Sequence, residues 1–374
     1  MRTQLCNTRY LDQSFHLVHG DISMEDGLFS PHTAPDKEDL QGAYVFPGLI
    51  DIHFHGCRGA DFADIDASGL RRIAAFLLES GTTSFSIASI SMPEEDLKRS
   101  YCEARRFAEL APRDCAQLLG ITMEGPFFSR AKRGAHDSAH LRPPDAGLVL
   151  RLDQYAGGLV KIVCVAPELE GAPEMIQALR SRYRIALAHT NADYDTAARA
   201  FDCGAVHLTH LFNAMPPIGH RSPGVIPAAA ERENVMVELI CDGVHVHPSA
   251  VRLAFRLFGA QRICLITDAI SPCGMPDGEY TLGNQTVTLR DGRITLPDGT
   301  LAGSGSTMLS CVRSAVQFGI PLEDAVRCAS WNPAVALGVQ HIVGSIAPGK
   351  RADCIVCDEQ LHIKRVYRAG ERVL

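Results

Sequence analysis

Short apolar runs and segments of helical periodicity alternate along most of the chain. Eight runs rich in β-branched and apolar residues are typical of buried strands, and they span residues 46–54, 83–89, 118–124, 160–167, 185–189, 206–211, 235–241 and 263–268. Between them, apolar residues spaced three and four apart predict amphipathic helices. The clearest stripe covers residues 70–78 and stops before Gly81, and further helices are expected over 94–111, 174–182, 193–203 and 248–258.

This order of elements determines the expected fold class. Eight strands that alternate with helices predict an α/β protein built on a TIM (β/α)8 barrel, which we place at residues 46–345. A doubly wound parallel sheet is the structural alternative. The chain lacks a glycine-rich phosphate fingerprint after a strand, which disfavours that alternative.

The two ends of the chain have a different pattern. Residues 1–45 alternate short polar and apolar stretches, and residues 352–358 and 363–373 again have the composition of strands. We therefore expect a small β-sandwich domain formed by both termini, residues 1–45 and 346–374. A β-hairpin excursion is expected over 279–301, with turns at Asp291-Gly292 and Asp298-Gly299.

Composition narrows the class of protein. The 374 residues are 46% hydrophobic and 21% charged, so the chain can bury a large core. A net charge of −7 argues against a general nucleic-acid binder, and no apolar run is long enough to cross a membrane. Thirteen scattered cysteines and a start without a secretory pattern predict reduced thiols in a cytoplasmic protein.

The first candidate chemistry is a pair of histidines at the end of the first expected strand. Residues i and i+2 of a strand point to the same face, so His53 and His55 are expected to project together. Two neutral imidazoles side by side suit a divalent metal. Two buried histidines bonded to backbone are the alternative interpretation of this pair.

Further ionisable residues recur at the carboxyl ends of other expected strands. They are Glu124, His189, His210 and Asp268. The carboxyl ends of the strands form the face on which TIM-barrel enzymes carry their active sites. Histidines with only a packing role would be scattered along strands and helices. The set therefore predicts a metal-dependent active site.

Longer motifs around these residues resemble a known family. Pro47-Gly-Leu-Ile-Asp-Ile-His-Phe-His-Gly and Gly344-Ser-Ile-Ala-Pro-Gly-Lys-Arg-Ala-Asp resemble signatures of the amidohydrolase superfamily. Within it, Met123-Glu-Gly-Pro-Phe, Lys132-Arg-Gly-Ala-His136, Thr209-His-Leu-Phe-Asn-Ala-Met-Pro and Asp242-Gly-Val-His245 resemble the N-acetylglucosamine-6-phosphate deacetylases. The resemblance covers roughly residues 45–358 and implies hydrolysis of N-acetylglucosamine 6-phosphate to glucosamine 6-phosphate and acetate.

The resemblance also implies roles for individual residues. His53, His55 and Asp268 would hold one divalent ion, His189 and His210 another, and Glu124 would bridge them. Zinc is expected first, with iron, manganese or cobalt as alternatives and one or two ions per subunit. Asp268 would act as general base and His136 as hydrogen-bond donor to the acetyl carbonyl.

Phosphate recognition is implied by the same resemblance. The expected donors are Arg221, His245 and the backbone N–H groups of Asn213 and Ala214. In the family the corresponding arginine reaches across from a neighbouring subunit, which implies a homodimer. Three alternatives remain: a deacetylase of N-acetylgalactosamine 6-phosphate, an amidohydrolase acting on another amide such as a cyclic one, and a non-catalytic binding protein on the same fold.

Overall fold

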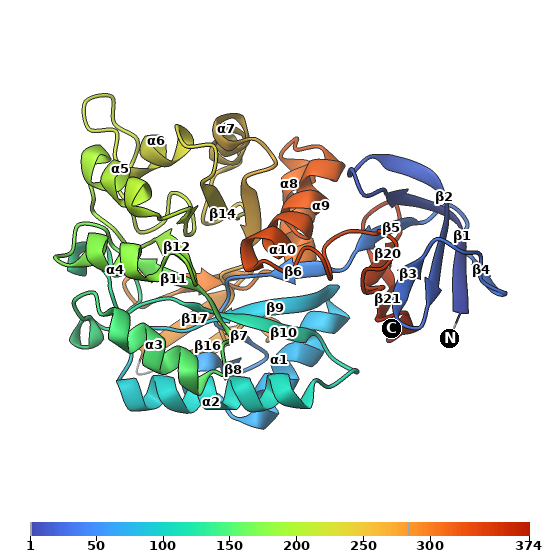
Figure 1. Ribbon diagram of the computed structural model, residues 1–374, viewed down its shortest axis with the longest axis horizontal. Helices are drawn as coiled ribbons and strands as arrows, with labels where there is room; N and C mark the ends of the chain where they lie inside the picture. Colours follow the sequence, from blue (N-terminus) through green and yellow to red (C-terminus); the bar gives the residue numbers. More distant parts are fainter. Residues whose placement is uncertain (1, 283–284) are drawn as a thin grey trace.

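Eight parallel strands form one sheet in which spatial order follows chain order (Figure 1). The computed structural model describes residues 2–282 and 285–374. The strands of this sheet are β6 (Leu49–Asp51), β9 (Thr82–Ala88), β10 (Gln117–Met123), β11 (Val160–Val165), β12 (Arg184–Leu187), β13 (His207–Leu208), β14 (Met236–Ile240) and β15 (Ile263–Ile266). Every residue of β9, β14 and β15 is buried, which explains their continuous apolar sequences.

The first and last strands of the sheet meet just beyond their carboxyl ends. The backbone N–H of Asp268 donates to the carbonyl oxygen of His53 at 2.9 Å. The backbone N–H of His55 donates to the carbonyl oxygen of Ala269 at 2.7 Å. We call these two hydrogen bonds the seam. They bring the two ends of the sheet together into the barrel that the sequence predicts, and the predicted α/β class is confirmed.

Helices connect the strands and cover the outside of the barrel (Figure 1). They are α1 (Ala67–Glu79), α2 (Glu94–Leu110), α3 (Ala146–Tyr155), α4 (Ala172–Leu179), α5 (Tyr194–Cys203), α6 (Val225–Ala230), α7 (Pro248–Phe258), α8 (Met308–Gln317), α9 (Leu322–Cys328) and α10 (Trp331–Leu337). Helix α1 buries the apolar stripe predicted for it, and Asp66 caps its N-terminus by accepting from Gly69 N–H at 2.6 Å.

Two clusters of buried side chains divide the strand residues between the inside and the outside of the barrel. On β15, Cys264 and Ile266 belong to one cluster and Ile263 and Leu265 to the other, as the alternation of a strand requires. The inner cluster includes Ala334 and other residues of α10, whereas the outer cluster packs against the surrounding helices.

Strands from both ends of the chain pair in a second sheet of eight strands. They are β1 (Arg2–Leu11), β2 (Leu17–Glu25), β3 (Leu28–Ser30), β4 (Asp36–Asp39), β5 (Tyr44–Pro47), β20 (Cys354–Cys357), β21 (Ile363–Arg368) and β22 (Glu371–Arg372). The two ends join where β5 pairs with β20, with Pro47 opposite Cys354. This is the small β unit expected from both termini, and Figure 1 shows it at one side of the barrel. The domain limits at 45/46 and 345/346 stay a prediction.

The remaining strands are short and lie near the mouth of the barrel. A two-stranded ribbon, β7 (Gly56–Cys57) with β8 (Ala60–Asp61), follows the first barrel strand. An antiparallel sheet of β16 (Gly278–Leu282), β17 (Gln285–Arg290), β18 (Arg293–Thr295) and β19 (Leu301–Ser304) follows the last one. It extends the excursion expected over 279–301, of which residues 283 and 284 lie outside the described residues. Ser304 N–H donates to the carbonyl oxygen of Asp268 at 2.9 Å, so this sheet is tied to the barrel mouth.

Two features differ from the sequence-based prediction. The first barrel strand does not begin at residue 46, because residues 44–47 pair in the terminal sheet and Leu49 starts the barrel strand after Gly48. Helices α3, α6 and α8–α10 were not predicted. Within the described residues, no helix is long and apolar enough to span a membrane.

Candidate active site

The candidate ligands all lie just beyond the carboxyl ends of barrel strands. They are His53 and His55 after β6, Glu124 after β10, His189 after β12, His210 after β13 and Asp268 after β15. The φ angles of 45° at His189, 29° at His210 and 50° at Asp268 lie in the left-handed region, which residues with a Cβ rarely adopt. Such strained backbone is found where the surrounding fold holds a functional residue in place.

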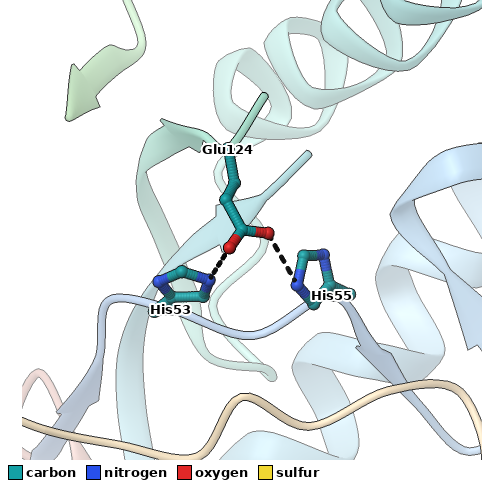
Figure 2. A group of neighbouring side chains, drawn as sticks. All are labelled: His53, His55 and Glu124. Carbon is teal, nitrogen blue, oxygen red and sulfur yellow. Dashed lines mark ion pairs between the residues drawn. The ribbon is translucent and has the colours of Figure 1, made fainter. Parts of the chain in front are cut away.

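The carboxylate of Glu124 lies at the centre of this cluster. Its Oε1 lies 3.4 Å from Nε2 of His53, 3.1 Å from Nε2 of His189 and 3.3 Å from Nε2 of His210. Its Oε2 lies 3.3 Å from Nε2 of His55. Figure 2 shows His53 and His55 pointing from one loop toward the two oxygens of Glu124. Four imidazoles from three strand ends therefore converge on one carboxylate.

The opposite ring nitrogen of three of these histidines contacts an oxygen acceptor. His53 Nδ1 lies 2.8 Å from Glu238 Oε2, His189 Nδ1 lies 2.8 Å from Lys132 O, and His210 Nδ1 lies 3.1 Å from Asn213 O. Ionised carboxylates and carbonyl oxygens only accept hydrogen bonds, so each Nδ1 carries a proton. Each Nε2 is then left as the nitrogen that can bind a metal.

The charges of the cluster shift one another's pKa values. Burial opposes ionisation of Glu124, but the neighbouring imidazoles, first His53, hold the pKa of this carboxyl well below its usual range. Burial lowers the pKa of His189 to about 4. Burial also acts to lower the pKa of His55, yet hydrogen bonds to Asp268 and Glu124 raise it to about 10. Carboxylates held ionised among imidazoles are groups that would bind a divalent cation in place of protons.

The surroundings of one nitrogen atom indicate whether these residues fit a metal ion. Nε2 of His53 is fully buried and has no hydrogen-bond partner among the described residues. An unpartnered buried nitrogen is costly, and a cation beside it would remove that cost. His53, His55 and Glu124 present ligand atoms that all lie within 4.8 Å of one another. Imidazole nitrogen with carboxylate oxygen is a donor set that divalent transition metals accept, so the residues fit a divalent metal site.

His136, on the loop after β10, has the opposite pattern of ring hydrogen bonds. The backbone N–H of Ser91 donates to its Nδ1 at 3.1 Å, so the proton of the neutral ring is on Nε2. That Nε2 lies 3.3 Å from Oε2 of Glu124, and it forms a close group with Glu124 and His189. A nitrogen that carries a proton cannot bind a metal. His136 is therefore a hydrogen-bond donor at the edge of the metal site.

A cavity of about 400 Å³ covers the cluster. Its lining includes His136 and most of the candidate ligands, and it extends to Asn213, Ala214 and His245. Nδ1 of His245 lies 2.7 Å from Oδ2 of Asp242. Burial acts to lower the pKa of His245, but the Asp242 carboxylate raises it above its usual value. The lining of the cavity thus includes an imidazole that favours its cationic form and suits an anion.

Two further residues lie outside the cluster, and of these only Arg221 was expected to take part in the site. Arg221 is exposed and does not line the 400 Å³ cavity of this single chain. Lys161, which belongs to strand β11, donates from Nζ to Gly158 O at 3.3 Å near the amino end of that strand. It is therefore remote from the carboxyl-end cluster, whose centre is the carboxylate of Glu124.

Sequence reasoning missed Glu238 and His207. Both are fully buried within the barrel, where Oε1 of Glu238 lies 3.1 Å from Nε2 of His207. The available signal was a charged residue inside the apolar run Met236-Val-Glu-Leu-Ile, since a buried carboxylate requires a buried partner. Ser91 carried no such signal. His247, in contrast, accepts from Ser249 N–H at the start of α7 and has the structural role that its position before Pro248 indicates.

Known proteins match this chain along nearly its whole length. The model of the amidohydrolase family matches residues 44–373. An N-acetylglucosamine-6-phosphate deacetylase of Bacillus subtilis (strain 168) is 38% identical over 359 residues, covering 93% of this chain and 91% of the relative. An N-acetylgalactosamine-6-phosphate deacetylase of Escherichia coli O157:H7 is 35% identical over 96% of this chain and 94% of its own length.

A solved structure agrees in fold as well. A mutant N-acetyl-D-glucosamine-6-phosphate deacetylase from Mycobacterium smegmatis, in complex with N-acetyl-D-glucosamine-6-phosphate, superposes with a TM-score of 0.92 at 34% identity. The match covers 100% of this chain and 99% of that one. With its barrel, its strand-end cluster of imidazoles and carboxylates and these matches, the chain belongs to the amidohydrolase family.

Proposed function

We propose that this protein hydrolyses N-acetylglucosamine 6-phosphate to glucosamine 6-phosphate and acetate. The observation that carries the proposal is one cavity of about 400 Å³ whose lining combines two kinds of chemistry. It includes the Glu124-centred cluster with His136, where an amide can be hydrolysed. It also includes His245, whose raised pKa suits a phosphate. The deacetylases at 38% and 34% identity support the same substrate class.

The proposed metal site uses the ligand atoms described above. His189 and His210 hold one position, His53, His55 and Asp268 the other, and Glu124 lies between them. We propose zinc, at one or both positions, because imidazole and carboxylate donors suit it; iron, manganese and cobalt share that preference. When bound, such a cation supplies Lewis acidity that polarises the amide carbonyl and lowers the pKa of water.

Two side chains of the cavity take part in the reaction: Asp268 transfers the proton and His136 binds the acyl oxygen. Although burial opposes it, the hydrogen bond to His55 lowers the pKa of Asp268, so its carboxylate is ionised and can accept a proton. Asp268 takes the proton from the attacking water and delivers it to the amine nitrogen as the C–N bond breaks. The Nε2–H of His136 donates to the acyl oxygen while negative charge grows on it.

Phosphate binding completes the proposal. The imidazolium of His245 and the backbone N–H of Ala214, both on residues that line the cavity, serve as donors to the phosphate. The N–H of Asn213, expected from the sequence as a further donor, instead donates to His210 O at 2.9 Å. Arg221, exposed in the single chain, contributes across the interface of a homodimer. The thirteen free thiols fit a reducing compartment, and we propose the cytoplasm.

An acetate-release assay on purified, metal-analysed protein tests the function. The expected result is turnover of N-acetylglucosamine 6-phosphate, with a lower kcat/KM for the unphosphorylated sugar. N-acetylgalactosamine 6-phosphate is the second substrate to test, because the 35%-identical relative is named for it. Equal turnover with and without phosphate would reject the assignment of His245 to phosphate binding, and absence of acetate release from either phosphate would reject the proposed function.

A further inference from the structure

Ser91 makes two contacts with the same ring nitrogen of His136. Its backbone N–H donates to Nδ1 at 3.1 Å, and its Oγ lies 2.8 Å from that atom. Ser91 follows β9 in a loop of the barrel mouth, and only 4% of its surface is exposed. The ring of Phe128 stands edge-on to the imidazole at a centroid distance of 4.9 Å. His136 is thus fixed from two sides.

The direction of these hydrogen bonds follows from the backbone donor. A peptide N–H can only donate, so Nδ1 of His136 must present its lone pair. The Ser91 hydroxyl then donates to the same atom as well, because an acceptor oxygen would require a proton on Nδ1. The one proton of the neutral ring is on Nε2, which lies 3.3 Å from Glu124 Oε2 and faces the cavity.

We propose that Ser91 is a positioning residue, which keeps His136 in the Nε2–H tautomer and aims that N–H at the acyl oxygen of the substrate. The inference rests on the proposed deacetylase function and deepens it. It also explains why His136 differs from His53, His189 and His210, whose Nδ1 atoms donate to oxygens. Among rings of one cluster, the hydrogen-bond partner of Nδ1 separates the donor from the metal ligands.

The surrounding backbone leaves little freedom for this contact. Gly125 has a φ of +83°, and a Cβ placed on it would lie 2.3 Å from Oγ of Ser91. A side chain at position 125 would therefore displace the Ser91 hydroxyl from His136. The glycine after Glu124 gives the loop that carries His136 room to approach Ser91.

Kinetic measurements on two substrates with different acyl groups separate a positioning role of Ser91 from general damage to the fold. In Ser91→Ala, loss of the hydroxyl contact is expected to lower kcat on the N-acetyl substrate by roughly 3- to 10-fold, with KM nearly unchanged. N-trifluoroacetylglucosamine 6-phosphate has a more electrophilic carbonyl and depends less on a donor, so its kcat should fall less than 2-fold, on the order expected for a weakly used hydrogen bond. Ser91→Thr keeps a hydroxyl and is expected to restore the N-acetyl rate.

A matched control lies two residues away. Ser89 is also buried, but its hydroxyl accepts from Tyr101 OH at 3.1 Å, which is not part of the catalytic cluster. Ser89→Ala is expected to keep kcat on both substrates. Equal losses on both acyl groups in Ser91→Ala, or an unchanged N-acetyl rate, would overturn the positioning role. Since wild-type turnover is measured in the same series, failure of the proposed function would be seen separately.

Nitrogen-15 NMR of the zinc-loaded wild-type protein reads the tautomer without relying on turnover. Signals of His136 are identified by their loss in His136→Gln. Protonated Nε2 with unprotonated Nδ1 supports the proposal, and a proton on Nδ1 overturns it. This measurement checks the tautomer that the proposal requires even if Ser91→Ala does not fold.

Discussion

Glu238 accepts a hydrogen bond from Nδ1 of His53 at 2.8 Å, although His53 follows β6 and Glu238 lies in β14. The same carboxylate lies 3.1 Å from Nε2 of His207 and accepts from the backbone N–H of His210 at 3.3 Å. Although burial opposes ionisation, His53 and His207 lower the pKa of Glu238 to about 2. One buried carboxylate thus forms hydrogen bonds with two candidate metal ligands, His53 and His210.

Glu238→Gln should weaken metal binding without removing a ligand. The neutral amide supports the Nδ1 proton of His53 less well, and outer hydrogen-bond partners of metal ligands typically contribute about 10- to 100-fold in affinity. Competition with a chromogenic chelator measures the change. Glu231→Gln, an exposed position, is the matched control. Unaltered affinity in Glu238→Gln would show that this carboxylate only fills space.

His189→Ala and His210→Ala should lose metal and activity together. Each removes an Nε2 that lies within 3.3 Å of Glu124 Oε1, and neither has a substitute at that position. His53→Ala and His55→Ala are expected to retain more metal and more activity, since Asp268 remains as a ligand at the metal position that these histidines share with it. Elemental analysis and acetate release on the same samples make the comparison. Full metal content and full rate in His189→Ala would contradict the whole metal assignment.

Asp268→Asn should lower turnover by at least about 10²-fold, the usual scale of general acid–base catalysis. The amide keeps the size of the side chain but cannot take the proton from water. Substrate binding, measured by calorimetry on the metal-loaded variant, is expected to survive. Near-normal turnover with normal metal content would remove Asp268 from its role as base.

Arg221→Ala should affect only the phosphorylated substrate. A charge-assisted hydrogen bond contributes about 1.5–3 kcal/mol, so kcat/KM is expected to fall roughly 10- to 150-fold on the 6-phosphate and little on the free sugar. Because Arg221 does not line the cavity of its own chain, mixed dimers of Arg221→Ala and Asp268→Asn are expected to regain activity in one hybrid site. Confirmed heterodimers without regained activity would contradict the contribution across the interface.

The pH dependence of phosphate selectivity should follow the His245–Asp242 pair. Asp242 raises the pKa of His245, so the imidazolium is fully present below that pKa and is lost as pH rises through it. The ratio of kcat/KM with and without phosphate is therefore expected to fall on the alkaline side. Asp242→Asn removes the carboxylate and lowers the pKa of His245, which moves the fall to lower pH. An identical profile in Asp242→Asn would exclude His245 as the titrating group.

Much of the barrel and of its strand-end cluster follows from local sequence patterns. His53 and His55 were found because two histidines two residues apart end a strand, and Asp268 because a carboxylate ends the last one. The first strand was predicted too long because apolar periodicity continues through Gly48, where the chain passes from the terminal sheet to the barrel. Such a transition depends on pairing with Cys354, far along the chain, and no local pattern contains it.

The supporting contacts were hidden for a related reason. The partners of Glu238, His207 and Ser91 are distant in sequence. The role of each contact depends on which nitrogen of an imidazole takes part in it. Hydrogen-bond direction at His136 is a property of the assembled loops. Local spacing identifies a ligand, whereas only the assembled fold identifies its tautomer.

The seam has a consequence for the order of events during synthesis. The seam joins residues that follow the first and last strands of the barrel, so a growing chain contains His53 and His55 long before Asp268 exists. The centre is completed by the same docking step that joins the two edges of the sheet. A cation held by His53, His55 and Asp268 would bind the closed barrel more tightly than the open one, and by mass action it would stabilise the contact between the ends of β6 and β15.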